Sequence, residues 1–134
     1  MSADQAVTDF QSRINTIEEA YEFMLAYASQ GLSSDQDSAT GRQAREFLKR
    51  CDAALTNLGS LLTDFTERLE PAAPYRAFIA VIDRDARDAQ AAVQLVLAQT
   101  SISSQLVDNL NASIHLRALL TDLFLIDEVL KAHR

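Results

Sequence analysis

The sequence of 134 residues has few of the side chains that build reactive sites or cross-links. It contains one cysteine, two histidines, three glycines and two prolines. Cys51 has no second cysteine with which to form an internal disulfide, and the Cys and His residues together are too few for the usual zinc ligand sets. The glycine-rich loop that cradles phosphates is missing. These shortages argue against disulfide-stabilised, zinc-dependent and P-loop proteins.

Further absences concern membranes, export and nucleic acids. No apolar run approaches the ~20 residues that a membrane-spanning helix needs. The first residues are small and polar, without the basic start and apolar run of a signal peptide. The formal net charge is −7, from 19 acidic and 12 basic side chains, and phosphate backbones are bound mainly by Lys and Arg. We therefore expect a cytoplasmic protein that binds neither membrane nor nucleic acid.

The sequence does contain apolar residues at every third or fourth position over most of its length. This spacing aligns apolar side chains along one stripe of a helix. The pattern pauses at a polar stretch, at a pair of prolines and at a run of hydroxyl residues. It predicts four helices, over residues 3–30, 41–69, 74–99 and 104–132. Helices of this length favour an all-α, antiparallel, up-and-down four-helix bundle in a single domain, 1–134.

Three residues on this pattern have specific expected roles. Gly31 follows the first helix, where a left-handed cap is needed that glycine adopts without cost. Gly59 falls inside the second helix and marks either a close contact with another helix or a mild kink. Cys51 lies on the apolar stripe of the same helix, so we expect a buried, unreactive thiol.

His115 is the residue with the most chemical interest. It shares a polar stripe with Asp108 and Asp122 on the last helix, so it should face water. In this it resembles histidine phosphotransfer domains, which are four-helix bundles with an exposed histidine midway along a helix. That family has Lys or Arg three residues after the histidine and Gly one further on, where this sequence has Ala118 and Leu119. Neither histidine follows a Glu by three residues, which excludes the di-iron carboxylate pattern.

Two sets of apolar residues fall outside the predicted core stripes. Phe23 and Tyr27 lie on the first helix, opposite its stripe. Leu120, Phe124 and Leu125 lie outside the stripe of the last helix. A helix that is apolar on two faces lies deep in a core or makes a second contact. We expect these five residues to form a protein interface, in which an antiparallel homodimer covers both sets.

The leading hypothesis is a small, non-enzymatic interaction or regulatory protein that acts through helical faces, without a cofactor or metal. Its partner is a second copy or another protein of unknown identity. Phosphotransfer at His115 is one alternative. Another is a bundle that encloses a small ligand, for which the alanines of the third helix leave space: Ala77, Ala80, Ala86, Ala89 and Ala92.

Overall fold

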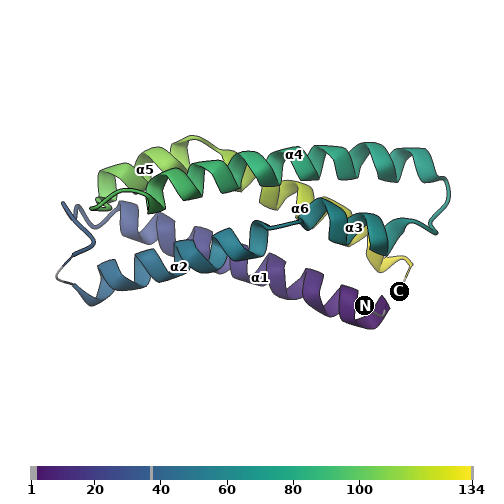
Figure 1. The fold of residues 1–134 in the computed structure, drawn as a ribbon, viewed down its shortest axis with the longest axis horizontal. Coiled ribbons are helices and arrows are strands. Elements are labelled where there is room, and N and C mark those ends of the chain that lie inside the picture. The colour runs from purple at the N-terminus through teal and green to yellow at the C-terminus, as the bar shows by residue number, and fades with distance from the viewer. Residues whose placement is uncertain (1–2, 37, 134) are drawn as a thin grey trace.

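The computed structural model describes residues 3–36 and 38–133, and this part of the chain has helices and no strands. The helices are α1 (Ala3–Ala28), α2 (Ala39–Leu55), α3 (Leu58–Thr66), α4 (Ala72–Leu97), α5 (Ser104–Ala112) and α6 (His115–Lys131). They run back and forth along the long axis of the molecule: α1 one way, α2 and α3 back, α4 out again, α5 and α6 back (Figure 1). The predicted all-α class is confirmed.

The prediction of four continuous helices is wrong, because two of them are interrupted. The helix predicted over 41–69 is divided into α2 and α3, and the one predicted over 104–132 into α5 and α6. The breaks contain Asn57, with φ of 58°, and Ile114, with φ of 62°. Both values belong to left-handed backbone, which cannot continue a right-handed helix.

Side chains from two neighbouring helices support the break between α2 and α3. Arg13 of α1 donates from Nη1 to the carbonyl oxygen of Thr56. Gln90 of α4 donates from Nε2 to the carbonyl oxygen of Asp52 at 3.1 Å. It also donates to the carboxylate of Asp52 at 3.0 Å. Carbonyls near a helix end lack partners within the helix, so these contacts make the break part of the packing.

Local capping explains where several helices begin and end. The hydroxyl of Ser38 accepts a hydrogen bond from the N–H of Gly41 at 2.9 Å, at the start of α2. The hydroxyl of Ser103 accepts one from the N–H of Leu106 at 3.0 Å, at the start of α5. Such bonds satisfy amides of the first turn. Gly31 has a φ of 68°, which confirms the left-handed conformation predicted after the first helix.

The two long helices, α1 and α4, each pack against α2 and α3 on one side and against α5 and α6 on the other. The buried apolar side chains form one continuous core. Its largest fully buried members come from α1, α2, α3, α4 and α6 and from the loop before α5: Tyr27, Phe10, Ile17, Met24, Leu48, Leu55, Leu58, Leu62, Ile82, Ile102, Leu119 and Leu123. Among the described helices, none has both the length and the apolar character to cross a bilayer.

Candidate functional site

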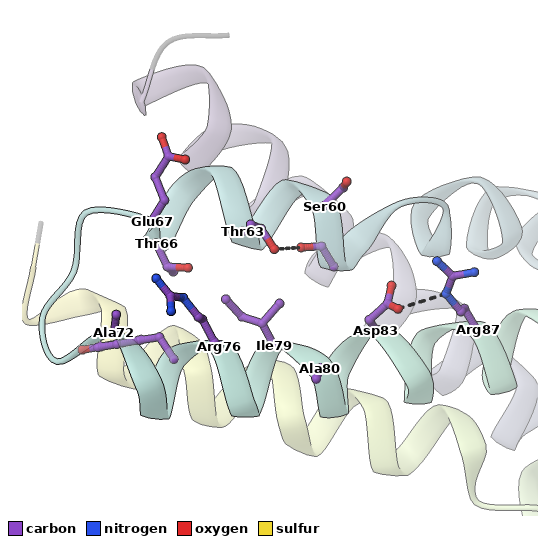
Figure 2. A pocket seen from close by; sticks show the side chains of 12 residues that line it. Ser60, Thr63, Thr66, Glu67, Ala72, Arg76, Ile79, Ala80, Asp83 and Arg87 are labelled. Carbon is purple, nitrogen blue, oxygen red and sulfur yellow. Dashed lines mark hydrogen bonds and ion pairs between the residues drawn. The ribbon is translucent and has the colours of Figure 1, made fainter.

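An open groove of about 430 Å³ lies between α3 and the part of α4 that runs from Ala72 to Arg87. Hydroxyl side chains of α3 line one wall, and Arg76 and Ile79 of α4 line the other (Figure 2). Because α3 has only nine residues, the groove reaches the loop that joins the two helices. The lining is therefore mixed, with polar groups from both helices around a small apolar base.

The threonine hydroxyls of this groove already donate their hydrogens. Thr63 Oγ1 donates to the carbonyl oxygen of Gly59 at 2.9 Å. Thr66 Oγ1 donates to the carbonyl oxygen of Leu62 at 2.7 Å. A hydroxyl has one hydrogen and two acceptor lone pairs, so both oxygens can accept a further hydrogen bond. The α3 wall therefore favours a ligand group that donates.

The α4 wall carries two arginines in different states. Arg87 donates from Nε to Asp83 Oδ2 at 3.0 Å, and this pair lies at one end of the groove (Figure 2). Arg76 extends from α4 toward Thr66 at the other end. Within residues 3–36 and 38–133, no hydrogen bond or ion pair engages the guanidinium of Arg76. Its positive charge is thus available to an anionic group, for which arginine is a strong donor.

Gly59 of α3 lies against Asp83 of α4 beside this groove. A Cβ at this position would lie 2.6 Å from Asp83 Oδ1 and 2.7 Å from Asp83 Cβ. Both distances are shorter than a real Cβ tolerates. The absence of a side chain at Gly59 therefore allows the close contact between α3 and α4. The position also follows the break at Asn57 by two residues.

The first set of predicted interface residues is covered within the molecule. Tyr27 is fully buried, and its hydroxyl donates to the carbonyl oxygen of Ile102 at 2.7 Å. Phe23 is partly buried and stacks on Phe47 of α2, with ring centroids 4.5 Å apart. The prediction of an exposed patch here is wrong, because Tyr27 follows the buried Met24 by three residues and shares its face.

The second set is divided between core and surface. Leu120 is only 5% exposed, so its predicted surface position is wrong; it lies three residues before the fully buried Leu123. Phe124 is 47% exposed and Leu125 is 55% exposed. Sequence reasoning missed Val129, which is 40% exposed and lies one turn after Leu125. We call Phe124, Leu125 and Val129 the α6 apolar patch.

His115 is exposed, as predicted. It is, however, the first residue of α6 and not a residue midway along a helix, because the chain breaks at Ile114. Leu116 and Leu119, its neighbours in sequence and one turn on, both lie in the core. The imidazole therefore lies at a helix start, and phosphotransfer at this position stays a prediction.

Cys51 is fully buried, as predicted. Burial, with a smaller effect of the neighbouring Asp52, raises the pKa of its thiol to about 12. The thiolate that reacts with electrophiles is therefore scarce at neutral pH. Across the part of the chain that the structure describes, no three His, Cys, Asp or Glu side chains lie close enough together to hold a metal ion.

An ion pair between the buried Asp35 and the half-buried Arg45 joins the loops at one end of the molecule, and the sequence pattern did not reveal it. Asp35 accepts a hydrogen bond from Arg45 Nε at 2.9 Å and one from the N–H of Ile102 at 2.6 Å. Arg45 also donates to the carbonyls of Leu97 and Gln99, at 3.1 Å each. Burial by itself raises the pKa of Asp35, but the hydrogen bonds from Arg45 and Ile102 outweigh it and lower the pKa below its ordinary value.

Ser104 links the same two loops through its backbone and side chain. Its N–H donates to the carbonyl oxygen of Leu32 at 2.8 Å. Its hydroxyl donates to the carbonyl oxygen of Tyr27 at 2.7 Å and accepts from the N–H of Leu32 at 2.9 Å. A Cβ on Gly41 would lie 2.0 Å from the carbonyl oxygen of Asp35, so α2 also packs directly on this loop.

Three surface features thus offer binding chemistry: the groove between α3 and α4, the α6 apolar patch and the imidazole of His115. No protein-family model, no curated protein and no solved structure matches this chain. The choice among the three features therefore depends on exposure, charge and contacts.

Proposed function

We propose that this protein is a non-enzymatic interaction protein that associates with a second copy through the outer face of α6. The α6 apolar patch carries the proposal. Its three residues are 40% to 55% exposed, whereas the opposite face of the same helix is buried in the core. Single exposed apolar residues are normal, but several on one helix face are typical of a contact surface. Recognition of this kind requires no catalytic group.

We propose a bundle architecture that leaves the outer face of α6 uncovered. In it, α2 with α3, and α5 with α6, each take the place of one helix in an up-and-down four-helix bundle. The outer face of the α6 segment then points away from the core. We further propose a cytoplasmic location, since the unpaired Cys51 is typical of a reducing compartment.

The charges beside the patch favour an antiparallel pair of α6 helices. Exposed Arg117 lies toward the start of α6, and exposed Glu128 lies toward its end. In an antiparallel twofold pair of α6 helices, the start of each helix lies beside the end of the other. The Arg117 end of each helix then lies beside the Glu128 end of its partner, which brings opposite charges together. A parallel pair would bring like charges together.

The interface involves α6 without α1. Tyr27 lies in the core and Phe23 is covered by Phe47, so α1 supplies no matching apolar patch of the kind expected from the sequence. The proposed dimer contact is therefore smaller than one that would involve both α1 and α6. We therefore expect a dimer that forms in the micromolar range, where moderate interfaces are occupied.

Sedimentation velocity over a range of protein concentrations tests the proposal. The wild-type protein should approach twice its 14.8 kDa mass as concentration rises. Leu125→Glu should remain monomeric, because a buried unpaired charge opposes association. Leu95→Glu is the matched control: Leu95 is also an exposed leucine, but it lies on α4, and this variant should dimerise like the wild type. A wild-type protein that stays monomeric throughout would refute the proposal.

A charge exchange tests the antiparallel arrangement. Arg117→Glu should weaken the dimer by placing two acidic groups together. The double variant Arg117→Glu with Glu128→Arg should restore it, because the attraction is reversed and not removed. Equal dimerisation by all three proteins would show that these charges do not face each other.

A second candidate function is the binding of a small molecule in the groove between α3 and α4. The observation in its favour is the unengaged Arg76 guanidinium opposite the acceptor oxygens of Thr63 and Thr66. Such a groove suits a ligand that has an anionic group at one end and a hydrogen-bond donor beside it, as in a hydroxy acid or an amino acid. Of the alanines predicted to leave space, Ala80 lines this groove, whereas Ala86 and Ala89 are buried.

Amide NMR spectra recorded during titration with lactate and with glycine test this candidate. Binding should shift the amide signals of Thr63 and Thr66, and Arg76→Gln should abolish the shifts. Arg84→Gln is the control, since Arg84 is exposed on α4 and does not line the groove. The absence of shifts at millimolar ligand would dismiss both compounds as ligands of the groove.

A further inference from the structure

Two carboxyl groups meet between α4 and α6, on the inner side of the α6 helix. Asp85 of α4 and Asp122 of α6 are both half-buried, and the carboxyl of Asp85 lies near enough to that of Asp122 to affect its protonation. The two helices pack closely along this seam. On α6 itself, the residues one turn before and after Asp122 are apolar, namely Ala118 and Ile126. The pair is therefore partly shielded from water.

A hydrogen bond between the two carboxyls requires a proton. An ionised carboxylate only accepts hydrogen bonds, so two of them can bond only when one carries a hydrogen. Oδ2 of Asp122 is enclosed and, within the described residues, has no hydrogen-bond partner. An enclosed carboxylate oxygen without a donor is costly when it is charged.

The helices around the pair carry further acidic groups as well as basic ones. The other acidic residues along the helices that pack on α6 include Asp88 on α4, Glu18 on α1 and Asp108 on α5. Arg84, next to Asp85 on α4, and His115, two turns before Asp122 on α6, are exposed. In the described part of the chain, no Arg, Lys or His forms an ion pair with Asp85 or Asp122.

The basic residues that do form ion pairs on these helices have other partners. Their pairs are Arg13 with Asp9, Arg87 with Asp83, and Lys131 with Glu128. Burial, followed by the hydrogen bond and the charge of Asp85, raises the pKa of Asp122 to about 7. The protonation state of Asp122 therefore changes near neutral pH.

We propose that Asp85 and Asp122 form a proton-dependent latch, which holds α4 against α6 while the pair shares a proton and loosens this seam when both carboxyls are ionised. The latch is independent of the proposed dimer, because it lies on the inner side of α6 and uses none of the residues of the α6 apolar patch. The latch responds to the binding of a proton, and this binding changes how tightly α4 packs against α6.

The direction of the pH dependence follows from the raised pKa. In the folded protein, Asp122 keeps its proton up to about pH 7, whereas its ordinary pKa is 3.8. Between these values the folded state binds more protons than the unfolded state. The free energy of unfolding therefore falls as pH rises through this window.

Urea unfolding at about pH 5 and about pH 8 tests the latch through this linkage. The wild-type protein should be less stable at the higher pH. Asp122→Asn should remove most of that loss and should be more stable than the wild type at the higher pH, because the amide is uncharged and can donate to Asp85. Asp64→Asn is the control, since Asp64 is exposed on α3, and it should keep the wild-type pH dependence.

Two measurements on the wild-type protein test the proposal without any variant. The carboxyl-carbon NMR signal of Asp122 should titrate with a midpoint near 7, and amide hydrogen exchange in α6, corrected for intrinsic rates, should be faster above that midpoint. Titration of Asp122 near its ordinary value would overturn the latch. An equal pH dependence of stability in the wild type and in Asp122→Asn would also overturn it.

Discussion

Gly59 of α3 and Asp83 of α4 lie closer together than any larger residue at position 59 would allow, since a Cβ there would be 2.6 Å from Asp83 Oδ1. Gly59→Ala gains up to ~1 kcal/mol of helix propensity. It also forces the Asp83 side chain and the two helices apart, and overpacking of this kind costs about 1–3 kcal/mol. We expect a net loss of about 1 kcal/mol in the free energy of unfolding by urea. Ser60→Ala, at the adjacent exposed position, should change it by less than about 0.5 kcal/mol.

Removal of the Asp35 charge should weaken the loop end of the molecule. Asp35→Asn loses charge-assisted hydrogen bonds from Arg45 and Ile102, and we expect a loss of about 1.5–3 kcal/mol at neutral pH. Because the folded pKa of Asp35 is lowered from its ordinary 3.8, this stabilisation is present above that value and is lost as pH falls through the folded pKa. The difference between wild type and variant, measured by urea unfolding, should therefore shrink in acid.

Asp9→Asn provides the comparison for Asp35. Asp9 pairs with Arg13 at 3.2 Å, but the carboxylate of Asp9 is more exposed than that of Asp35. Exposed ion pairs contribute about 0–1 kcal/mol. An equal loss in the two variants would show that the burial of Asp35 has no energetic importance.

Ile114→Gly should stabilise the protein. A β-branched residue in left-handed backbone is strained by roughly 1–2 kcal/mol, and Ile114, with a φ of 62°, is also 58% exposed, so it loses little packing. The greater freedom of glycine in the unfolded chain offsets roughly 0.5–1 kcal/mol. We expect a net gain of about 0.5 kcal/mol by urea unfolding.

Asn57→Gly is the matched control for Ile114→Gly, because asparagine already tolerates left-handed backbone. It should show no gain, or a small loss. A loss of stability in Ile114→Gly itself would mean that the Ile114 side chain packs more than its exposure indicates.

The helical class, most of the buried stripes and the cap at Gly31 could be predicted because they depend on local spacing. The helix breaks at Asn57 and Ile114 could not be predicted in this way. The apolar pattern continues across Asn57 and Ile114, and neither residue is glycine or proline. The first break is supported by Arg13 and Gln90, which are distant in sequence.

The candidate sites were predicted only in part, for a related reason. Tyr27 was assigned to the surface because it lies opposite the predicted stripe of the first helix, and the carbonyl of Ile102 that accepts from its hydroxyl lies 75 residues away. The exposure of Phe124 and Leu125 followed from their positions on the helix. The groove beside Gly59 and the pairing of Asp85 with Asp122 depend on which helices are neighbours, and no local pattern contains that information.

Cys51 should react slowly with a thiol reagent such as dithionitrobenzoate in the native protein. Its thiol is fully buried and its pKa is raised to about 12. The reagent therefore cannot reach the sulfur easily, and little of the thiol is present as the reactive thiolate. In urea above the unfolding midpoint, the reaction should become fast and reach one equivalent. Fast labelling of the native protein would mean that α2 opens readily at this position.

Acetyl phosphate should leave His115 unmodified, as judged by mass spectrometry under alkaline conditions that preserve phosphohistidine. The imidazole is exposed, but Ala118 and Leu119 replace the cation and the glycine expected of a phosphotransfer site. His115→Gln should alter the free energy of unfolding by less than about 0.5 kcal/mol. A phosphoryl group found on wild-type protein and missing from His115→Gln would promote phosphotransfer over the dimer proposal.

The bonds that Ser104 makes to Leu32 and Tyr27 have a consequence for how the molecule opens. Loop amides usually exchange with solvent through small local fluctuations, independently of the helices. Here the amide hydrogens of Leu32, Ile102 and Ser104 are all held by bonds that cross between two loops. Their release requires the separation of segments more than sixty residues apart, so the loops at this end share the cooperative opening of the helices that they join.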